Sequence, residues 1–335
     1  MKISIITTFY NSVKLGDFVN RSMSCLLNQT YKNIEFVCVN DGSDDNTLLE
    51  LKAYAEIDNR IVIVYKENEG VAQYAKAAGQ DIATGDYIML FDHDDYLSLD
   101  AIEKAVEVLS NDISIDAVTM MVKTQYLDGR IKYLSNLDVL INSEREFEQR
   151  FISGENMFCK TVGRYDIHFR GLIRNEKFKS ESFRFKEKLV NGDEIVERLI
   201  FKNLNKVSSC AGVYEHYIYE NSSAKSYNLK KTDIVKTDIL LREIFQKENV
   251  YNDRKLIFEM TAYKNLINGM KVYQNLKNQL SDEKKIFYVD RLKDGFNKLD
   301  KSLILSEFNK FNKIYHGMML SNFRIFNYFY SVKKD

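Results

Sequence analysis

The sequence contains no proline and no tryptophan, and it has only four histidines and four cysteines. Without proline the chain lacks a common turn signal, so glycine and short polar residues must mark the element boundaries. The four cysteines are scattered and form no C-x-x-C pair, which predicts reduced thiols that belong to the core rather than to a catalytic centre. The glycine-rich phosphate-binding patterns G-x-G-x-x-G and G-x-x-x-x-G-K-[ST] are also absent.

Net charge and long apolar runs are lacking as well. The 48 Lys and Arg residues balance the 48 Asp and Glu residues, which argues against a general polyanion binder, and we expect no nucleic-acid partner. No apolar run approaches the ~18 residues of a transmembrane helix, and the apolar segment at the N-terminus is too short for a signal peptide. We therefore expect a cytoplasmic protein whose 335 residues form one large domain and a smaller one.

The first 110 residues alternate between short apolar strands and amphipathic helices. Continuous apolar strands are predicted at 3–7, 34–40, 61–66 and 86–91. The intervening segments have helical spacing, at 14–29, 45–56, 70–84 and 99–110. Such alternation is typical of a parallel sheet covered by helices on both faces. The sequence therefore predicts an α/β fold with a Rossmann-like, mostly parallel sheet.

The pattern changes after this region. Two strands are predicted within 116–134, joined by a turn at Asp128-Gly129, and a further strand at 206–220. Helices are predicted over 143–153 and 191–204. From about residue 228 the chain is rich in Lys, Asn, Leu, Ile and Tyr at helical spacing. We expect a catalytic α/β domain over 1–226 and a helical domain over 227–335.

Polar residues follow the ends of the predicted strands. In parallel sheets, ligands bind just beyond the carboxyl ends of the strands. These side chains are therefore expected to converge on one crevice, and they are Thr8, Tyr10, Asn11, Asn40, Asp41, Glu67, Asn68, Asp92, Asp94 and Asp95.

The stretch YIMLFDHDDYL, residues 87–97, leads an apolar strand directly into three carboxylates. Asp92 and Asp94 are two residues apart and point to the same side of an extended chain. Two carboxylates on one side can hold Mg²⁺ or Mn²⁺ when a diphosphate and water supply the remaining ligands. An Asp-rich turn and helix N-cap is the alternative. An EF-hand loop is disfavoured because Leu97 occupies the position that requires glycine.

At these residues the chain resembles a family 2 glycosyltransferase with the GT-A fold, over about residues 2–226 and most strongly over 2–100. SIITTFYNS is similar to the family's opening strand, with Thr8 where proline is usual, and IEFVCVNDGSDDNT is similar to its second strand. ENEGVAQYAKAAGQDIATGDYIMLFDHDDYL is similar to the stretch that ends in the family's D-x-D motif.

The resemblance implies a site for a nucleotide-sugar donor, with a UDP-sugar expected. Thr8, Tyr10 and Asp41 match positions that hold the nucleotide base. Lys76 matches a cation near the base and the phosphates. Asn11 and Asn68 are further expected donor contacts.

The resemblance also implies a metal ion, Mn²⁺ or Mg²⁺, at the acidic segment. Asp92 matches a residue that faces the ribose, and Asp94 matches the metal ligand. Asp92 and Asp95 are expected to assist it. His216 precedes the family's closing loop, from which some relatives contact the metal or diphosphate; a packed or surface histidine is the alternative.

A catalytic base is implied in the segment NGDEIVERL. The family often has a Glu-Asp pair that opens a helix under the acceptor, whereas the order here is Asp193-Glu194. Glu194 matches the base by its spacing from Gly192, and Asp193 matches it by side-chain type, so both remain candidates. A helix N-terminus at which acids favour the dipole is the alternative for both.

Three further residues are weaker candidates. Arg170, in RGLIR, is similar in place to the family's acceptor-side segment and is expected to meet an acceptor or a phosphate, with an ordinary surface arginine as the alternative. Ser223 and Lys225 lie in a polar loop that would close over the diphosphate.

The C-terminal segment 315–335 is aromatic with interspersed Lys and Arg. Three interpretations remain open: packing against the catalytic domain or a second copy, lying on the inner face of the plasma membrane, or binding an extended acceptor.

These features predict an inverting, metal-dependent transferase that moves a sugar from a nucleotide diphosphate to a hydroxyl of a glycan, lipid-linked or polymer acceptor. Inversion of configuration and a place in bacterial surface-polysaccharide synthesis are implied by the resemblance alone. A sugar nucleotidyltransferase is disfavoured because TTFYNSVK lacks a glycine-rich, arginine-containing loop. A catalytically inactive nucleotide-binding scaffold remains the alternative, because the order of Asp193 and Glu194 is inverted and the acceptor-side tryptophan is missing.

Overall fold

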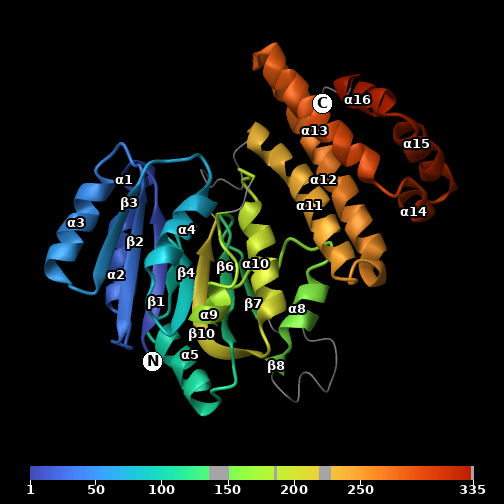
Figure 1. Ribbon diagram of the computed structural model, residues 1–335. Coiled ribbons are helices and arrows are strands. Elements are labelled where there is room, and N and C mark those ends of the chain that lie inside the picture. The colour runs from blue at the N-terminus through green and yellow to red at the C-terminus, as the bar shows by residue number, and fades with distance from the viewer. Residues whose placement is uncertain (136–150, 185–186, 219–227, 333–335) are drawn as a thin grey trace. The chain divides into compact units, whose positions relative to one another are not determined.

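The structure is a computed structural model that describes residues 1–135, 151–184, 187–218 and 228–332 (Figure 1). The chain divides into two compact units. The first comprises Met1–Phe158, Ile167–Lys188 and Val196–Ala224, and the second comprises Cys159–Asp166, Leu189–Ile195 and Lys225–Asp335. The domain boundary predicted after residue 226 lies outside the described residues and stays a prediction.

The N-terminal half of the first unit is a parallel sheet built from the predicted apolar strands. Its order is β3–β2–β1–β4, formed by β1 Ile3–Phe9, β2 Ile34–Asp41, β3 Ile61–Lys66 and β4 Tyr87–Asp92. All the residues of β2 are buried, because helices cover both faces of the sheet and leave no strand face for polar side chains. The predicted alternation of strand and helix is confirmed for this half.

Helices cover both faces of these strands. Helices α2 (Phe18–Leu27) and α5 (Ala101–Asn111) share a buried cluster with Ile5 and Phe36, while α4 (Ala72–Ile82) packs against Ile6 on the opposite face. Ile5 and Ile6 point to opposite faces because side chains alternate along a strand.

Two further helices complete this half of the unit. Helix α3, Thr47–Ile57, packs beside β3. The single helix predicted over 14–29 is divided into α1, Ser12–Leu15, and α2, because Gly16 has a φ of +156° that ends α1.

Helix α4 approaches the sheet closely at Gly79. A Cβ atom on this residue would lie 2.3 Å from Cγ2 of Ile6 and 3.2 Å from Cγ2 of Val39. The first distance is far inside van der Waals contact, so only glycine allows the helix to lie this close to β1. Lys76 lies three residues earlier, on the same side of the helix, and is buried.

The other half of the sheet is mixed. Its order continues from β4 as β9–β6–β10–β5, formed by β9 Gly171–Arg174, β6 Ala117–Gln125, β10 Val207–Tyr217 and β5 Tyr96–Leu97. Strand β9 runs antiparallel to both β4 and β6, whereas β6 and β10 are parallel. The parallel order predicted from the first hundred residues therefore does not extend to this half.

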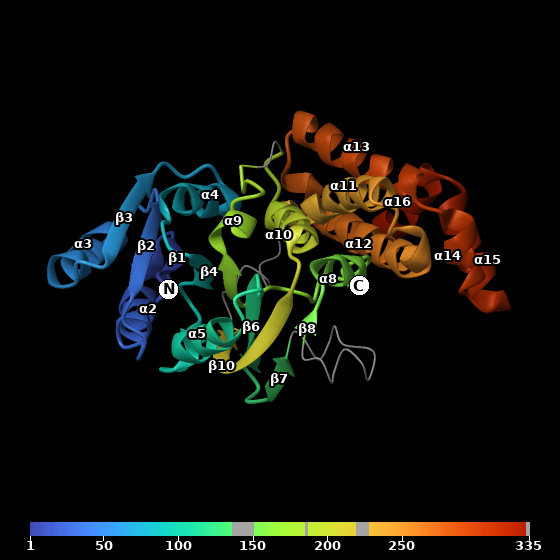
Figure 2. The same cartoon turned by 60° about the horizontal axis from the view of Figure 1, so that its bottom comes forward.

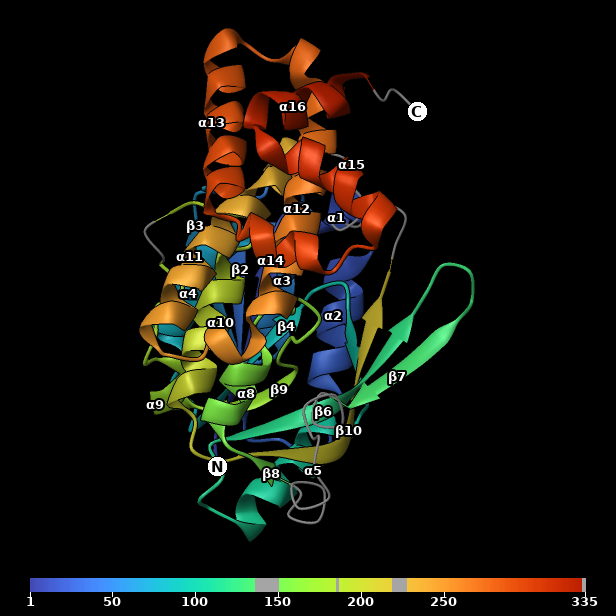
Figure 3. The ribbon, with the colours of Figure 1, turned by 90° about the vertical axis from the view of Figure 1, so that its right-hand side faces the viewer.

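Two short strands pair at the margins of the mixed half. Strand β7, Ile131–Ser135, forms a hairpin with β6 (Figure 3), and Gly129 in its turn has a φ of +82°, which confirms the predicted turn. Strand β8, Phe151–Ile152, pairs with β10. Residues 143–150 of the helix predicted over 143–153 lie outside the described residues, and for 151–152 the prediction of a helix is wrong.

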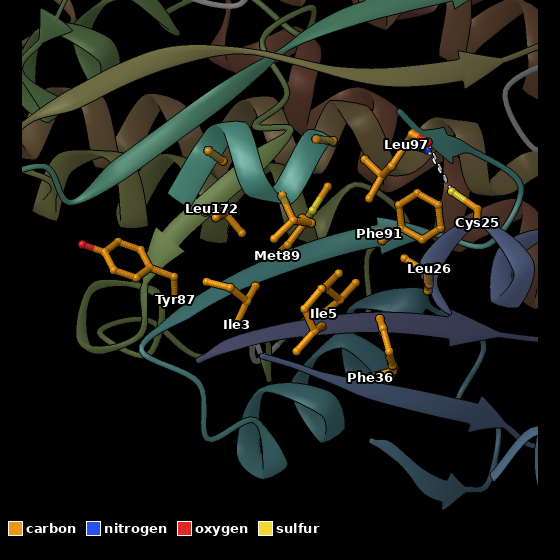
Figure 4. Close-up of a cluster of buried hydrophobic side chains, with 14 of the residues drawn as sticks. Ile3, Ile5, Cys25, Leu26, Phe36, Tyr87, Met89, Phe91, Leu97 and Leu172 are labelled. Carbon is orange, nitrogen blue, oxygen red and sulfur yellow. Dashed lines mark hydrogen bonds between the residues drawn. The ribbon is translucent and has the colours of Figure 1, made fainter. Parts of the chain in front are cut away.

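One hydrophobic cluster extends across the sheet of the first unit (Figure 4). Ile5, Phe36 and Met89 of the strands contact side chains of α2 and α5, and none of the three is exposed. Removing a side chain of this size from water contributes about 1.5–3 kcal/mol to folding. Figure 4 also shows the backbone N–H of Leu97 donating to Sγ of Cys25 at 3.1 Å, which fixes β5 just after the acidic segment.

Between the hairpin and β10, the described residues contain the helices α8 Gly154–Lys160, α9 Asn175–Phe178 and α10 Gly192–Asn203. Helix α10 corresponds to the helix predicted over 191–204. The division between the units passes through it, so its first turn belongs to the second unit and the rest to the first.

The second unit is helical from residue 228 onward over its described residues (Figure 2). Its α-helices are α11 Asp233–Lys247, α12 Lys255–Leu276, α13 Asp282–Lys298, α14 Lys301–Ser306, α15 Lys310–Ser321 and α16 Phe323–Val332. Short 3₁₀ turns join some of them, at Leu229–Thr232, Asn252–Arg254 and Lys277–Gln279. None of the described helices is both long and apolar enough to cross a membrane.

A buried polar cluster lies among α11, α12 and the start of α14. Oε1 of Glu259 accepts hydrogen bonds from Nε of Arg242 at 3.1 Å, from its Nη2 at 2.7 Å and from the hydroxyl of Tyr251, while Oε2 accepts from the backbone N of Asp300 at 2.7 Å. Asp238 accepts from the hydroxyl of Tyr165 at 2.6 Å and from Nδ2 of Asn265 at 3.0 Å. The helices thus enclose carboxylates whose donors come from the protein itself.

Candidate active site

Four neighbouring strands bring their carboxyl ends to one edge of the sheet. Thr8 of β1 is the register partner of Asp92 in β4, and Phe9 is the partner of Asn40 in β2. Asp41 follows Asn40 and pairs in register with Lys66 of β3. The strand ends that the sequence marks with polar residues therefore lie side by side.

Asp41 and Asn68, two predicted donor contacts, are joined directly. Nδ2 of Asn68 donates to Oδ2 of Asp41 at 2.9 Å, and Nζ of Lys66 donates to Oδ1 at 2.8 Å. Gly42 has a φ of +66°, and a Cβ atom there would lie 2.6 Å from the backbone N of Asn68. The turn after β2 thus brings Asp41 to Asn68, and Lys66 is a charged neighbour that the sequence did not single out.

Asn11 organises the loops after β1 and β2. Its φ of 50° is left-handed, a conformation that asparagine tolerates. Its Oδ1 accepts from the backbone N of Asp44 at 2.9 Å, and its backbone N donates to Oγ of Ser43 at 3.0 Å. Tyr10, the preceding residue, is 46% exposed, so its ring is available to stack on a ligand.

The acidic segment is held by Arg170, which directly precedes β9, and by residues of β10. Nη2 of Arg170 donates to Oδ2 of Asp92 at 2.9 Å. Asp95 is buried, and its two carboxylate oxygens accept from the hydroxyl of Tyr214 at 2.7 Å and from the backbone N of Tyr217 at 3.1 Å. Asp95 therefore anchors the turn to β10, while Asp92 carries the ion pair.

Tyr214 links these groups to one another. Its hydroxyl accepts from the backbone N of Asp92 at 3.3 Å while it donates to Asp95, and the Arg170 guanidinium lies 5.1 Å from the centre of its ring. The sequence analysis missed Tyr214. The alternation of β10 contains a signal for it, because Tyr214 and His216 are two residues apart and share a face of the strand.

Several acids occupy this region with few cations to balance them. Burial opposes ionisation of Asp92, but Arg170 and Lys76 outweigh it and lower its pKa. Burial, followed by Asp92 and Asp94, raises the pKa of Asp95 to about 8. Burial also raises the pKa of Asp94; Asp92 adds to the effect, and His93 opposes it. Like charges gathered in this way favour the binding of a cation.

His216 lies close enough to Asp92 and Asp94 to feel both charges. Burial and then Arg170 lower its pKa, and the two carboxylates only partly offset them. Its imidazole is therefore neutral near pH 7, the form that can bind a metal ion. The metal-ligand interpretation of His216 and the alternative of a packed histidine both stay predictions.

The donor set fits Mg²⁺ or Mn²⁺ by its chemistry. The carboxylates of Asp92 and Asp94 supply hard oxygen ligands, and His216 supplies a nitrogen. Among the residues that the structure describes, no group of three His, Cys, Asp or Glu side chains is gathered tightly enough to hold an ion by itself. Mg²⁺ sites in nucleotide enzymes commonly use one or two carboxylates and take their other ligands from substrate phosphates.

His93 has a structural contact that the sequence did not reveal. Its Nδ1 lies 3.0 Å from the backbone O of Thr8, and its ring packs against Phe9 and Phe18 at 5.8 and 5.5 Å between centres. It thereby fastens the acidic segment to the end of β1. Of the predicted cations, Lys76 on α4 is near enough to Asp92 to lower its pKa.

Asp193 and Glu194 occupy the first turn of α10, in the second unit. Glu194 is buried, and its backbone N donates to Oδ1 of Asp193 at 3.1 Å. Both the base and the N-terminal-acid interpretations stay predictions. Ser223 and Lys225 lie outside the described residues.

Comparison with known proteins identifies the family. The family model described as glycosyl transferase family 2 matches residues 4–179, just over half of the chain. The chain belongs to glycosyl transferase family 2. The match includes all four strands of the parallel half, the acidic segment and Arg170.

Relatives of this family 2 chain include named glycosyltransferases. Glycosyltransferase GlyG of Streptococcus pneumoniae is 38% identical over 101 residues, which cover 30% of this chain and 33% of GlyG. Chondroitin synthase of Pasteurella multocida is 28% identical over 327 residues, which cover 92% of this chain and 31% of that protein. The chain thus spans about a third of the length of these two relatives.

Solved structures share the fold of this family 2 chain. A crystal structure of S. aureus TarS residues 1–349 in complex with UDP-GlcNAc has a TM-score of 0.62 and 17% identity, covering 98% of this chain and 89% of that one. A second structure of the same TarS segment, in complex with UDP, has a TM-score of 0.56. The predicted GT-A fold, a sheet flanked by helices with a helical C-terminal region, is confirmed, with the difference that the sheet is mixed.

Proposed function

We propose that this family 2 chain is a metal-dependent, inverting glycosyltransferase. It transfers a sugar from a nucleotide diphosphate, with UDP as the nucleotide, to a hydroxyl of a glycan, lipid-linked or polymer acceptor in bacterial surface-polysaccharide synthesis. One observation carries the proposal: Asp92, at the end of a parallel strand of a family 2 domain, forms an ion pair with Arg170, and Asp94 and His216 are near enough to Asp92 to interact with it electrostatically. The TarS complexes support UDP as the nucleotide.

The donor nucleotide is assigned to the ends of β1 and β2. The exposed ring of Tyr10 stacks on the base, and Thr8 and Asp41 hydrogen-bond to it. Asn68 acts by orienting Asp41, and Asn11 acts by holding the two loops in place.

The diphosphate is assigned to the acidic segment and the two cations beside it. Asp94, with Asp92 and His216, holds Mn²⁺ or Mg²⁺, which when bound stabilises the negative charge that develops on the leaving diphosphate. Asp92 also faces the ribose, and Asp95 supports the segment through Tyr214 and the backbone of Tyr217. Arg170 and Lys76 add positive charge near the phosphates.

The transfer is a single displacement at the anomeric carbon. The acceptor oxygen forms a bond to that carbon as the bond to the diphosphate oxygen breaks, and the electron pair leaves with UDP. The acceptor proton passes to a carboxylate, Asp193 or Glu194, which must lie within hydrogen-bond reach of the hydroxyl. Attack from the side opposite the leaving group inverts the configuration.

The two domains are proposed to divide the work between them. Residues 1–226 form the catalytic domain and bind the donor, and residues 227–335 form a helical domain for packing, oligomerisation or association with acceptor or membrane. The protein is proposed to act in the cytoplasm or at the inner face of the plasma membrane, where nucleotide sugars are available.

A thermal-shift series tests the donor and the metal together. UDP, UDP-GlcNAc, UDP-glucose and GDP-mannose are each added to the full chain with Mn²⁺, with Mg²⁺ or with a chelator. Ligands that bind only the folded state raise the midpoint by mass action. We expect a shift with UDP compounds that requires the metal. Equal shifts with and without chelator would overturn the metal assignment, and a shift with GDP-mannose alone would overturn the choice of UDP.

Turnover separates the enzyme from an inactive nucleotide-binding scaffold. We expect slow, metal-dependent hydrolysis of the UDP-sugar that stabilises the chain, followed as release of UDP. Asp193→Asn and Glu194→Gln should each retain donor binding, and the substitution at the base should abolish turnover. Metal-dependent binding without hydrolysis or transfer to any hydroxyl acceptor would favour the scaffold.

A further inference from the structure

Helix α15 in the second unit carries an exposed apolar stripe. Phe311 is 83% exposed, Ile314 63%, Tyr315 37% and Met318 56%. These residues are spaced three and four apart, so they lie on one side of the helix. Met319 and Leu320, on another side, are buried and hold the helix to the unit. The stripe therefore lies on the exposed side of α15, away from the side that packs into the second unit.

The neighbouring helix α16 also has exposed apolar side chains. It packs against α15 (Figure 3). The rings of Tyr315 and Phe329 meet edge to face with 5.6 Å between their centres. Ile325 and Tyr328 of α16 are 41% and 67% exposed, whereas Phe326 is buried. We call the exposed residues of the two helices the C-terminal apolar face: Phe311, Ile314, Tyr315, Met318, Ile325 and Tyr328.

The charge around this face has one sign. The sequence from 308 to 332 contains Lys310, Lys313 and Arg324 but no Asp or Glu, although the whole chain has no net charge. All three cations are exposed, and none of them forms an ion pair with a carboxylate in the described part of the chain. The surface thus combines exposed aromatic and aliphatic groups with uncompensated positive charge.

We propose that the C-terminal apolar face binds the surface of an anionic lipid bilayer. Aromatic and aliphatic side chains enter the boundary between headgroups and acyl chains, and the long Lys and Arg side chains reach back to the headgroups. A second copy of this chain is a poorer occupant, because a two-fold interface would bring this cationic face against itself. The inference concerns the second unit alone and does not depend on the identity of the donor.

Vesicle flotation of the full chain tests the proposal. Vesicles of phosphatidylcholine alone are compared with vesicles that also contain phosphatidylglycerol, at low and at high salt. Each Lys or Arg near an anionic surface strengthens binding by about fivefold, and salt screens this attraction. We therefore expect binding to the anionic vesicles only, and weaker binding at high salt. Equal binding to both vesicles, or none to either, would overturn the proposal.

A matched pair of substitutions locates the surface. Ile314 in the stripe and Ile286 on α13 are both 63% exposed, but Ile286 lies in a helix that begins with Asp282 and Glu283. Ile314→Asn should weaken vesicle binding by about tenfold, since the side chain no longer enters the apolar layer. Ile286→Asn should leave it unchanged, and circular dichroism checks that both variants fold.

Two results would contradict the proposal. If both variants bind anionic vesicles as the unaltered chain does, the apolar face is not the contact and the proposal fails. If the unaltered chain sediments as a dimer that Ile314→Asn dissociates, and no vesicle is bound, the face is an interface between copies. The shift in melting temperature that UDP and metal cause should be the same for Ile314→Asn and for the unaltered chain. A failure of membrane binding can therefore be distinguished from a failure of the proposed function.

Discussion

The two units each enclose a group of carboxylates, and the groups differ in what surrounds them. In the second unit, Glu259 is 1% exposed and accepts donors from Arg242, Tyr251 and the backbone of Asp300. In the first unit, the side chain of Asp92 is 38% exposed and meets Arg170 on one oxygen, while Asp94 follows two residues later. The Glu259 carboxylate is closed to solvent by the surrounding protein, whereas the Asp92 carboxylate is partly open to solvent.

The difference distinguishes a stabilising cluster from a binding site. Buried carboxylates contribute to a fold only when the protein satisfies them, because desolvation of an unmatched charge costs several kcal/mol (on the order of 3–5). The Glu259 cluster meets that condition. In the acidic segment, burial and the neighbouring carboxylates raise the pKa values of Asp94 and Asp95, and such crowding of carboxylates favours a cation from outside.

The largest expected effect is on folding, at Glu259. Glu259→Gln removes the charge that balances the buried Arg242 guanidinium and should lower the free energy of unfolding by about 3–5 kcal/mol. Chemical denaturation measures this change. Metal-dependent UDP binding at a temperature where the variant is folded should be unchanged. A loss below about 1 kcal/mol would show that the Glu259 cluster does not stabilise the second unit.

Asp94→Asn should have the opposite profile. It keeps the shape of the side chain but removes the proposed metal ligand, so turnover should fall by roughly 10²–10³-fold. The free energy of unfolding should not fall, because the substitution removes a carboxylate that Asp92 repels. UDP release and denaturation are measured on the same preparation. Retained metal-dependent UDP binding would contradict the assignment of Asp94.

The pH dependence of stability sharpens the contrast at Asp238. Burial raises the pKa of this carboxyl to about 6, although Tyr165 and Asn265 donate hydrogen bonds to it. The folded state therefore holds the proton more tightly than the unfolded state, and stability falls as pH rises from about 4 to 6. The size of the fall is up to about 3 kcal/mol.

Asp238→Asn tests this pH dependence, because the amide stays neutral throughout. The difference in melting temperature between the original chain and the variant should change across pH 4 to 6 and be constant above it. Asn265 can turn its amide to accept from the new side chain, which limits the cost of the substitution itself. A difference that is independent of pH would show that Asp238 is ionised throughout.

The smallest expected effect is at Tyr214. Tyr214→Phe removes the hydroxyl that links Asp95 to the backbone of Asp92, a loss of about 1 kcal/mol, so affinity for UDP with Mn²⁺ should fall by about fivefold. Tyr217→Phe is the matched control, because its hydroxyl bonds Gln125 and Glu215 while its backbone N holds Asp95. Titration calorimetry measures both variants, and equal affinities would remove Tyr214 from the site.

Elements with a strong local signal were predictable from the sequence. Strand β3 has the predicted limits, and the turn at Gly129 follows from Asp-Gly chemistry. Strands β5 and β9 were missed because they have two and four residues, too few for a periodic pattern. The direction of β9 depends on its neighbours β4 and β6, which are far away in the sequence.

The candidate site was predictable as a set of strand ends but not as a network. Asp92, Asp94 and Asp41 were found because each follows an apolar strand. The ion pair of Asp92 with Arg170 and the bond of Asp95 with Tyr214 join residues 78 and 119 positions apart. No local pattern encodes such distances, and so Arg170 was expected at an acceptor or phosphate rather than on Asp92.

The close approach of α4 at Gly79 has a consequence for how this site can vary. Lys76 is carried on the same side of the helix, so its distance from Asp92 is set by how closely the helix lies on β1. A single added methyl group at position 79 would push the helix outward and take the cation with it. If the proposed function is correct, a substitution at Gly79 changes the affinity for the nucleotide, although Gly79 itself lies against Ile6 and Val39.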